Sequence, residues 1–463
     1  MPAANHSNSN IGGGGPARHL VSIDDLTNDE IRELFALADR ISNNPKEFVT
    51  TCTGHILASL FYEASTRTRL SFESAMQRLG GGVVSAADMR ASSASKGESL
   101  ADTVRVVSAY ADVIVLRHPK EGAAAVARKY AHVPVVNAGD GSHEHPTQTL
   151  CDLYSLQVEK GNIEGLDVVL SGDLKYSRTI HSFAFALARF GANLVCAPQP
   201  GFEMPDYVIH RLREQYRVEP HRVEVQDLAS IAPQMDAMYF TPERPHQLSL
   251  FTDIREINVK KFDALYVTRP QRERFSDEEK NNNFYFKVDR AALSGNKFRE
   301  TVVLHPLPRV DELSYDLDED PRSIYFEQAA RGVPVRMAVL GVLLGKFQLQ
   351  SKPADVNEKS SACIRATHEC INQNCITHSE RRYLMPEFVL VSREPFRVRC
   401  IYCDSEKLIE FVGCASTHHY HLANSSEVLR IKAENLVAFG SEAQAGTAGF
   451  TLANTRGTIH HPA

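Results

Sequence analysis

The fold is decided by residues 56–82, which read ILASLFYEASTRTRLSFESAMQRLGGG. The run 56–62 is mostly apolar and predicts a strand that is covered on both faces. A helix is indicated further on by apolar residues at positions i, i+3, i+4 and i+7, namely Phe72, Ala75, Met76 and Leu79. The glycines at 80–82 end that helix. The stretch therefore predicts a strand, a polar turn and an amphipathic helix, which together form one unit of an α/β fold.

Similar apolar runs alternate with helical patterns on both sides of this stretch. The first series comprises the runs 56–62, 83–87, 113–116 and 133–137. The second series comprises the runs 168–170, 194–197, 237–241, 264–268 and 302–304. Short apolar strands separated by helices are typical of parallel sheets covered on both faces. We therefore expect an α/β protein with two parallel-sheet domains, residues 20–150 and 151–347, joined by a bridging helix near 145–160.

The remaining parts of the chain lack this alternation. Residues 1–19 are rich in Asn, Ser and Gly and lack the apolar core of a signal peptide, so we expect a disordered leader. Residues 348–361 are expected to form a linker, and a small Cys-rich, β-rich domain is expected at 362–412. The tail, 413–463, is assigned no structure or function. Its one apolar segment, 428–439, is expected to form either a strand pair or nothing stable.

The bulk composition argues against two classes of protein. A formal charge of −6 over 463 residues is unlike that of a general nucleic-acid-binding protein, which is usually basic. No apolar run approaches the roughly 18 residues that a membrane-spanning helix needs. The crowding of cysteines near the C-terminal part suggests a bound metal before it suggests disulfides. We therefore expect a cytoplasmic protein that binds neither nucleic acid nor a membrane.

The polar turn 63–69 has the composition of a phosphate-binding site. The first turn of a helix exposes unpaired N–H groups and the positive end of the helix dipole. Ser65, Thr66 and Thr68 add hydroxyl donors, and Arg67 adds a guanidinium whose fork suits a phosphate group. The alternative is an ordinary helix cap with solvated arginines. The number of consecutive donor residues favours the phosphate site.

Several segments closely resemble the carbamoyltransferases that act on aspartate or ornithine. The run 61–73 is similar to the carbamoyl phosphate signature of that family. Further matches follow in the same order over roughly residues 18–350, at Ser92 with 96–98, at 117–119 and at 145–149. The resemblance implies transfer of the carbamoyl group of carbamoyl phosphate to an amino acid. No residue looks like a covalent nucleophile, so catalysis should depend mainly on placement and electrostatics.

The resemblance also implies which side chains contact carbamoyl phosphate. The phosphate group is expected to be held by Ser65, Thr66, Arg67 and Thr68. The carbonyl oxygen, on which negative charge develops during the reaction, is expected to be surrounded by Thr68, Arg117 and His145.

Further roles follow from the same resemblance. Gln148 is expected to hold the carbamoyl NH₂ group, while Leu307 and Pro308 place backbone carbonyls near the attacking amine. Ser92 and Lys96 are expected to enter the active site of a neighbouring subunit, where Lys96 contacts both substrates. A lone lysine in a loop is usually solvated, so this role depends wholly on the resemblance.

The second domain is expected to select the amino acid. Aspartate brings two carboxylates, which suit guanidinium forks, whereas ornithine brings a cation and needs an acidic partner. Arg178 and Arg269 lie at predicted strand ends, where ligand sites of parallel sheets form. The segments around both resemble the aspartate enzymes and imply that Gln271 assists them. The run 305–309 lacks the cysteine that is typical of ornithine enzymes, so aspartate is favoured and ornithine stays an alternative.

Two close cysteine pairs, Cys370 with Cys375 and Cys400 with Cys403, lie in the C-terminal module. Thiolates in two such pairs match a structural Zn²⁺ site with no position open for catalysis, with free thiols or disulfides as the alternative. The module resembles the zinc domain of the aspartate carbamoyltransferase regulatory chain, which docks on the catalytic chain in that family. The nucleotide-binding domain that precedes it there has no counterpart between 348 and 362, so we expect no usual nucleotide regulation. The resemblance implies a homotrimer with shared active sites, and leaves open a hexamer formed through the zinc domain.

Two other functions stay open at this stage. A non-catalytic carbamoyltransferase-like scaffold could use the zinc module to bind a partner chain, although the retained site residues argue against it. The module could instead be a nucleic-acid-binding ribbon, because it carries the arginines Arg381, Arg382, Arg393, Arg397 and Arg399. The sequence favours an enzyme of the aspartate branch, which acts early in pyrimidine biosynthesis.

Overall fold

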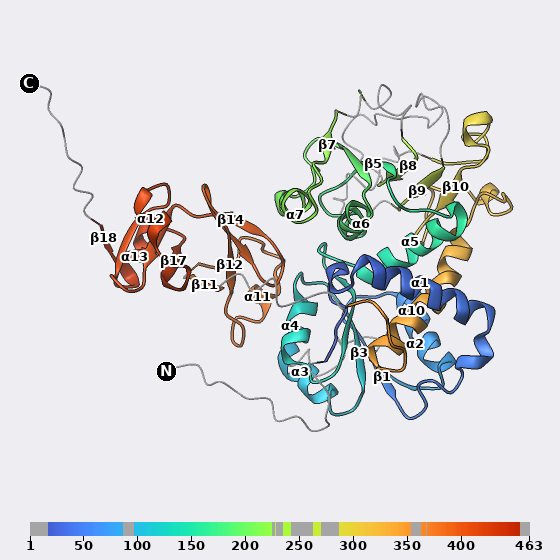
Figure 1. The fold of residues 1–463 in the computed structure, drawn as a ribbon, viewed down its shortest axis with the longest axis horizontal. Helices are drawn as coiled ribbons and strands as arrows, with labels where there is room; N and C mark the ends of the chain where they lie inside the picture. Colours follow the sequence, from blue (N-terminus) through green and yellow to red (C-terminus); the bar gives the residue numbers. More distant parts are fainter. Residues whose placement is uncertain are drawn as a thin grey trace, which may run out of the picture.

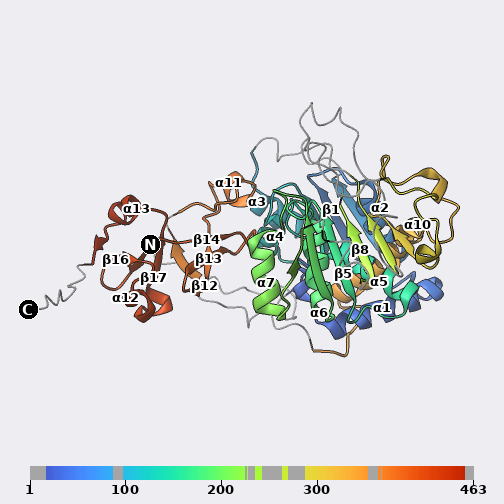
Figure 2. The same cartoon turned by 90° about the horizontal axis from the view of Figure 1, so that it is seen from above.

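The computed structural model describes residues 17–86, 97–224, 227, 235–241, 263–269, 287–352, 363–366 and 368–453. Two α/β domains lie next to each other, and a smaller β-rich module lies to one side of them (Figures 1 and 2). The expected fold class, two parallel-sheet domains with a β-rich third domain, is confirmed. Within the described ranges, none of the helices is both long enough and apolar enough to cross a bilayer.

The first domain is built on a parallel sheet with the strand order β2-β1-β3-β4. Its strands are β1 (Ile56–Phe61), β2 (Gly82–Ala86), β3 (Val113–His118) and β4 (Val135–Asp140). Its helices are α1 (Asn28–Asn43), α2 (Thr66–Arg78), α3 (Leu100–Val107) and α4 (Ala123–Tyr130). The strands β3 and β4 are buried along their whole length, as continuous apolar runs predict for a sheet that is covered on both faces.

The second domain has a six-stranded sheet in the order β10-β9-β8-β5-β6-β7, with every pair parallel. Its strands are β5 (Asp167–Gly172), β6 (Asn193–Pro198), β7 (His221–Arg222), β8 (Ala237–Phe240), β9 (Ala264–Val267) and β10 (Val302–Leu304). Its helices include α6 (Arg178–Arg189) and α7 (Asp206–Tyr216). The predicted bridging helix is α5 (Pro146–Lys160). It packs against α10 (Tyr325–Leu343), which also packs on α1 and α2 and so ties the second domain back to the first.

The C-terminal module is larger than the sequence suggested. Its sheet has eight strands in the order β14-β13-β12-β11-β17-β15-β16-β18. These are β11 (Cys363–Ala366), β12 (Phe388–Arg393), β13 (Phe396–Cys400), β14 (Glu406–Leu408), β15 (Phe411–Cys414), β16 (His419–Leu422), β17 (Leu436–Phe439) and β18 (Thr451–Leu452). The short helices are α11 (Ile376–Ser379), α12 (Ser426–Arg430) and α13 (Glu442–Thr447). The boundary expected at residue 412 falls inside β15, so the tail as far as residue 453 belongs to this module.

The segment 428–439 shows why the tail was misjudged. It was expected to form a strand pair or nothing stable, but it contains the end of α12 and the single strand β17. Strand β17 is fully buried and pairs in parallel with β11 and antiparallel with β15. Because β11 lies some seventy positions earlier in the chain, as the two strand ranges give, no local pattern reveals this pairing.

The module packs on the first domain through the turn before α4. The Ile376 N–H donates to the Glu121 carbonyl oxygen at 2.9 Å, and the Glu121 N–H donates to the Asn374 carbonyl oxygen at 3.1 Å. The Glu121 carboxylate accepts a further hydrogen bond from Asn372 Nδ2 at 2.6 Å. Behind these contacts, buried side chains of α4 and of the module form one hydrophobic cluster. The module is therefore docked on its own chain by strand-like hydrogen bonds as well as by apolar packing.

Arg211 on α7 links the second domain to the first domain and to the module. Its guanidinium lies 2.6 Å from Asp24, 3.0 Å from Glu144 and 3.4 Å from Asp404. Asp24 and Glu144 come from the first domain, and Asp404 directly follows Cys403 in the module. Burial alone would lower the pKa of Arg211, but these carboxylates hold it well above its ordinary value. The three parts of the chain thus share one buried ionic contact.

Replacing Arg211 should therefore destabilise the protein strongly. Arg211→Met removes the guanidinium from three carboxylates, of which Glu144 is 1% exposed, and removing one partner of a buried pair costs about 3–5 kcal/mol. The matched control is Arg213→Met on the same helix, because Arg213 is exposed and its ion pair is with the exposed Glu219. We expect the control to change the free energy of unfolding by less than about 0.5 kcal/mol. Thermal and urea unfolding of both variants would measure this, and equal losses would contradict the assignment.

Candidate active site and metal centre

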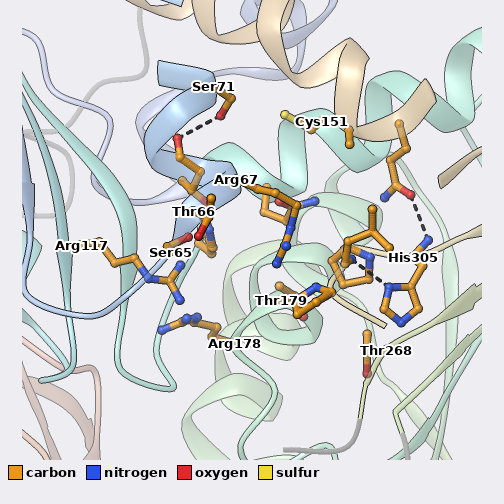
Figure 3. A pocket seen from close by; sticks show the side chains of 18 of the residues that line it. Ser65, Thr66, Arg67, Ser71, Arg117, Cys151, Arg178, Thr179, Thr268 and His305 are labelled. Atoms are coloured by element: carbon orange, nitrogen blue, oxygen red, sulfur yellow. Dashed lines mark hydrogen bonds between the residues drawn. The ribbon is translucent and has the colours of Figure 1, made fainter. Parts of the chain in front are cut away.

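A cavity of about 700 Å³ is lined by both α/β domains. The first domain contributes the junction of β1 and α2, the end of β3 and the start of α5. The second contributes the start of α6, the residues after β9 and the loop after β10, with α10 along one side. These are mostly the carboxyl ends of parallel strands, where ligands bind in such folds. In Figure 3, Arg67 lies between Ser65 and Thr66 on one side and His305 on the other.

Most of the residues singled out in the sequence lie together in this cavity. They are Ser65, Thr66, Arg67, Thr68, Arg117, His145, Gln148, Arg178, Arg269, Leu307 and Pro308. The remaining predicted residues, Ser92, Lys96 and Gln271, lie outside the described residues. The fold therefore gathers into one place side chains that are up to 243 positions apart, which is the separation of Ser65 from Pro308.

The N-terminus of α2 forms one wall of the cavity. Thr66, Arg67 and Thr68 make up its first turn, where backbone N–H groups have no partner within the helix. Ser65 is the N-cap residue, with φ −158° and ψ 97°, yet its hydroxyl makes no capping hydrogen bond. The alternative of an ordinary side-chain cap therefore does not hold here. This wall can offer both backbone and hydroxyl donors to an anion.

Positive charge is concentrated around that wall. Burial and the neighbouring Arg178 lower the pKa of Arg117 to about 9, which still leaves its guanidinium charged at neutral pH. Burial and Arg269 lower the pKa of Arg67, so guanidinium groups from both domains face the same space. The carboxylate of Glu63 lies between two of them, 3.4 Å from Arg117 and 3.2 Å from Arg178. Burial would raise the pKa of Glu63, but these two arginines lower it overall, so Glu63 is ionised.

His145 begins α5 and is buried beside these arginines. Its N–H donates to Ser182 Oγ at 3.0 Å, which fixes the backbone at the start of the helix. Burial, and then the charges of Arg117, Arg178 and Arg336, keep the pKa of His145 well below its ordinary value. The ring is therefore neutral at neutral pH. The Thr147 hydroxyl lies 3.4 Å from His145 Nδ1, and in the tautomer whose Nδ1 accepts from it, Nε2 carries the ring proton and can donate it to a ligand.

The second domain supplies a structured loop after β10. His305 Nδ1 accepts from the Leu307 N–H at 2.8 Å, and His305 Nε2 lies 2.8 Å from the carboxylate of Glu312. Leu307 has a φ of 52°, in the left-handed region that a branched side chain rarely adopts. Such backbone strain costs about 1–3 kcal/mol and is found mostly where function requires a particular geometry. The loop thus holds Leu307 and Pro308, which line the cavity, in a fixed conformation.

Several lining residues were not identified from the sequence. They are Glu63, Tyr176, Thr179, Gln328 and Arg336. Glu63 lies in the polar turn quoted at the start, where its position just after a strand was the available signal. Arg336 and Gln328 lie on α10, and nothing in that helical pattern marks them as site residues.

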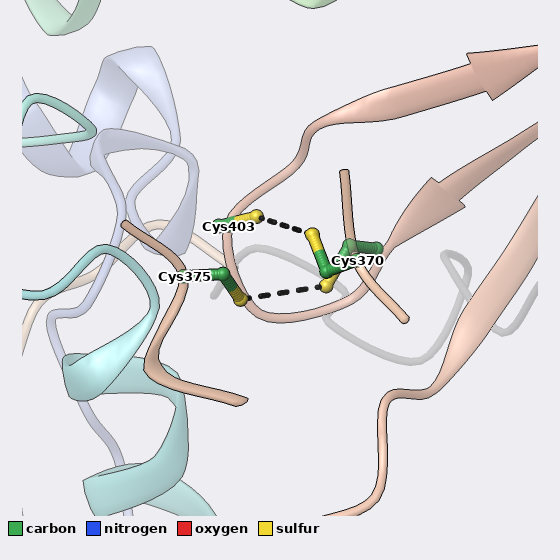
Figure 4. A group of neighbouring side chains, drawn as sticks. Cys370, Cys375 and Cys403 are labelled. Carbon is green, nitrogen blue, oxygen red and sulfur yellow. Dashed lines mark hydrogen bonds between the residues drawn. The ribbon is translucent and has the colours of Figure 1, made fainter. Parts of the chain in front are cut away.

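The predicted cysteine site is assembled in the module. The sulfur atoms of Cys370, Cys375, Cys400 and Cys403 all lie within 4.8 Å of one another, and all four residues are buried. Figure 4 shows Cys370, Cys375 and Cys403 pointing toward one another. The Thr377 hydroxyl donates to Cys375 Sγ at 3.2 Å, which suits a thiolate ligand. A donor set of sulfur atoms alone, with no open position, fits a structural metal ion.

Three family models match this chain. The model described as "Aspartate/ornithine carbamoyltransferase, carbamoyl-P binding domain" matches residues 18–158. The model described as "Aspartate/ornithine carbamoyltransferase, Asp/Orn binding domain" matches residues 242–343. The third, "Aspartate carbamoyltransferase regulatory chain, metal binding domain", matches residues 363–410. The matches thus cover most of the first α/β domain, the part of the second domain from residue 242 on, and the cysteine-containing part of the module.

Individual relatives give the same result. The aspartate carbamoyltransferase catalytic subunit of Clostridium perfringens is 46% identical over 332 residues, which cover 71% of this chain and 98% of that protein. The subunit of Thermoplasma acidophilum is 42% identical over the same share of both chains. The solved catalytic subunit from M. jannaschii is 40% identical, with a TM-score of 0.57, and covers 71% of this chain and 98% of that one. A Trypanosoma cruzi enzyme solved with N-(phosphonacetyl)-L-aspartic acid is 33% identical, with a TM-score of 0.57, over 70% and 95% of the two chains.

The metal site predicts a specific pattern of metal loss. Cys403→Ser should abolish tight binding of the metal and unfold much of the module, because metal binding supplies folding free energy to such small domains. The matched control is Cys363→Ser, since Cys363 is exposed and lies outside the cluster. Elemental analysis of purified protein should find a single bound metal ion per chain in the control and none in the variant. Full metal content in Cys403→Ser would contradict the assignment.

Proposed function

Because this chain belongs to the aspartate carbamoyltransferase family, we propose that its cavity transfers the carbamoyl group of carbamoyl phosphate to L-aspartate. The products are N-carbamoyl-L-aspartate and phosphate, which is an early step of pyrimidine biosynthesis. The observation that carries the proposal is the convergence of the α2 N-terminus with Arg67, Arg117, Arg178 and Arg269 in one cavity. The two substrates together bring a phosphate and two carboxylates, which are the anions that such a site can hold.

The reaction starts with attack of the unprotonated aspartate amine on the carbonyl carbon. A C–N bond forms, and negative charge moves onto the carbonyl oxygen. When the carbonyl forms again, the C–O bond to phosphate breaks, phosphate leaves with the electron pair, and the amine loses a proton to phosphate or solvent. We assign Thr68, Arg117 and the neutral His145 to the carbonyl oxygen, because donors aimed at developing charge lower the barrier. Residues 65–68 hold the phosphate as it leaves.

The remaining contacts complete the placement of the two substrates. We assign Gln148 to the carbamoyl NH₂ group, and the backbone carbonyls of Leu307 and Pro308 to the region of the attacking amine. A bound pair in the correct geometry gains on the order of 7–11 kcal/mol of barrier reduction from positioning.

Aspartate is the acceptor that the charges favour. We assign Arg178 and Arg269 to its carboxylates, with Gln271 assisting. The hydrogen bonds of Arg178 to Glu63 and to the Gly141 carbonyl both use Nη1, so Nη2 and Nε are the donors assigned to aspartate. Ornithine would need a carboxylate for its side-chain ammonium, and Glu63, the acidic residue among the described lining residues, is already paired with two arginines.

The assembly and the metal form the second part of the proposal. Ser92 and Lys96 act in the site of a neighbouring subunit of a homotrimer, and contacts through the module are the route by which trimers would pair into hexamers. The metal held by Cys370, Cys375 and Cys400 with Cys403 is Zn²⁺, since tetrahedral thiolate sites prefer it. A reducing cytoplasm keeps these thiols available as ligands.

Purified protein should form carbamoylated product from carbamoyl phosphate with L-aspartate and not with L-ornithine. Arg269→Gln should lower kcat/KM for aspartate about a hundredfold, because it removes a charge-assisted contact to a carboxylate. Arg222→Gln is the matched control, since Arg222 is an exposed arginine at the edge strand β7 of the same domain. Turnover with ornithine alone would overturn the assignment of the second domain. Absence of turnover with either amino acid, in folded and metal-replete protein, would favour the non-catalytic scaffold.

Shared active sites predict complementation between two inactive variants. Lys96→Ala and His145→Ala should each be inactive alone, because each removes one contribution to every site. After mixing under conditions that exchange subunits, some sites combine an intact His145 with an intact Lys96 from the neighbour, so activity should return. A mixture that exchanges subunits but stays inactive would mean that each site is complete within one chain.

A further inference from the structure

Asp152 lies at the centre of a buried hydrogen-bond network beside the cavity. It follows Gln148 by one turn on α5 and is 1% exposed. Its Oδ1 accepts from Gln148 Nε2 at 2.8 Å and from Gln328 Nε2 at 2.7 Å. Its Oδ2 accepts from the Tyr266 hydroxyl at 2.9 Å. The carboxylate therefore joins side chains from α5, α10 and β9, which line or support the cavity from both domains.

The network determines how both glutamine amides point. The His305 backbone N–H, which can only donate, lies 2.9 Å from Gln328 Oε1, so Gln328 must turn its NH₂ group toward Asp152. An ionised Asp152 can only accept, so Gln148 must likewise turn its NH₂ group toward it. This leaves Gln148 Oε1, on a residue that lines the cavity, as the atom available to a ligand donor. A carbamoyl NH₂ group is such a donor.

The same carboxylate reaches the loop after β10 and the end of β9. Gln328 connects it to His305, whose ring accepts from the Leu307 N–H. Tyr266 precedes Arg269 by three positions and stacks on Tyr239, with ring centroids 4.1 Å apart. Displacing the Asp152 carboxylate would thus disturb the Gln148 amide and the support of the Leu307 loop together.

We propose that Asp152 is a positioning residue for carbamoyl transfer, which turns Gln148 Oε1 toward the carbamoyl NH₂ group and anchors the loop at 305–308 through Gln328. The assignment rests on the function proposed above. Asp152 touches neither substrate and acts through its hydrogen-bond partners. Its effect should therefore appear first in the binding of carbamoyl phosphate.

The surroundings of Asp152 give this role a pH dependence. Burial raises the pKa of Asp152 to about 7, while hydrogen bonds from Gln328, Gln148 and Tyr266, and the charge of Arg336, oppose that rise. Tyr239 on β8 and Cys151 on α5 also face it, and both stay protonated at neutral pH because burial raises their pKa values. As the pH falls through about 7, the carboxyl gains a proton, so one of its oxygens becomes a donor and the hydrogen bonds around it must rearrange.

The first experiment compares Asp152→Asn with the wild-type protein at saturating aspartate. The variant keeps the shape of the side chain but offers only one acceptor oxygen, so KM for carbamoyl phosphate should rise about tenfold, with a smaller fall in kcat. Tyr154→Phe is the matched control. Tyr154 also lies on α5 but does not line the cavity, and the change removes its hydrogen bond to Asp39 on α1. The control should keep wild-type kinetics.

A double-mutant cycle separates positioning from general damage. If Asp152 acts partly through Gln148, then Asp152→Asn should raise KM for carbamoyl phosphate by a smaller factor in the Gln148→Ala background than in the wild-type protein. Fully additive increases would overturn the proposal, as would a wild-type KM in Asp152→Asn. An inactive wild-type protein would instead overturn the proposed function, so the two failures are distinguishable.

A second variant keeps the test decisive if Asp152→Asn does not fold. Tyr266→Phe removes one donor from the carboxylate, which should raise its pKa further and shift the acidic limb of kcat/KM for carbamoyl phosphate to higher pH. His145 does not confuse this measurement, because its pKa lies well below the ordinary value. An acidic limb that stays in place in Tyr266→Phe would overturn the proposal.

Discussion

Positive charge confined to one cavity is the constraint on which the rest of this structure depends. The α2 N-terminus, Arg117 and Arg178 meet where water is partly excluded, and burial there lowers the pKa of Arg117 to about 9. Like charges at such separations repel each other strongly unless anions lie among them. Glu63 supplies one carboxylate by pairing with both arginines. The charge that remains is available to anionic substrates and gives the site affinity for a phosphate and two carboxylates.

The helix α5 positions part of the cavity wall between the two domains. Its first residues, His145 and Gln148, line the cavity, and the next turn carries Asp152 into a buried network with β9 and α10. Because α10 packs on α1, α2 and α5, the helices that hold the site are supported from both domains. Catalysis by placement requires this kind of support, since a misplaced contact loses most of its value.

The C-terminal module depends on two interactions that are separate from the cavity. A buried group of sulfur ligands organises its first half, while Glu121 and Arg211 hold it to the α/β domains. Asp404, which contacts Arg211, directly follows the ligand Cys403, so the metal site and the docking contact are neighbours in the chain. Loss of the metal should therefore weaken docking as well as the module's own fold.

Local chemistry in the sequence was enough to predict the two α/β domains, the position of residues 65–68 at a helix N-terminus and the grouping of the four cysteines, because each is a short run or a fixed spacing. Cys400 and Cys403, for example, are three positions apart, so a single turn brings their thiols together whatever the rest of the fold is. The extent of the module was not predictable, since β17 is defined by pairing with the distant β11. The same holds for Glu63 as a counterion, for Arg211 as a link and for Asp152 as a hub, all of which look like ordinary charged residues in the sequence. Only the tertiary structure decided their roles, because burial and the partners that surround a charge are set by segments far away in the chain.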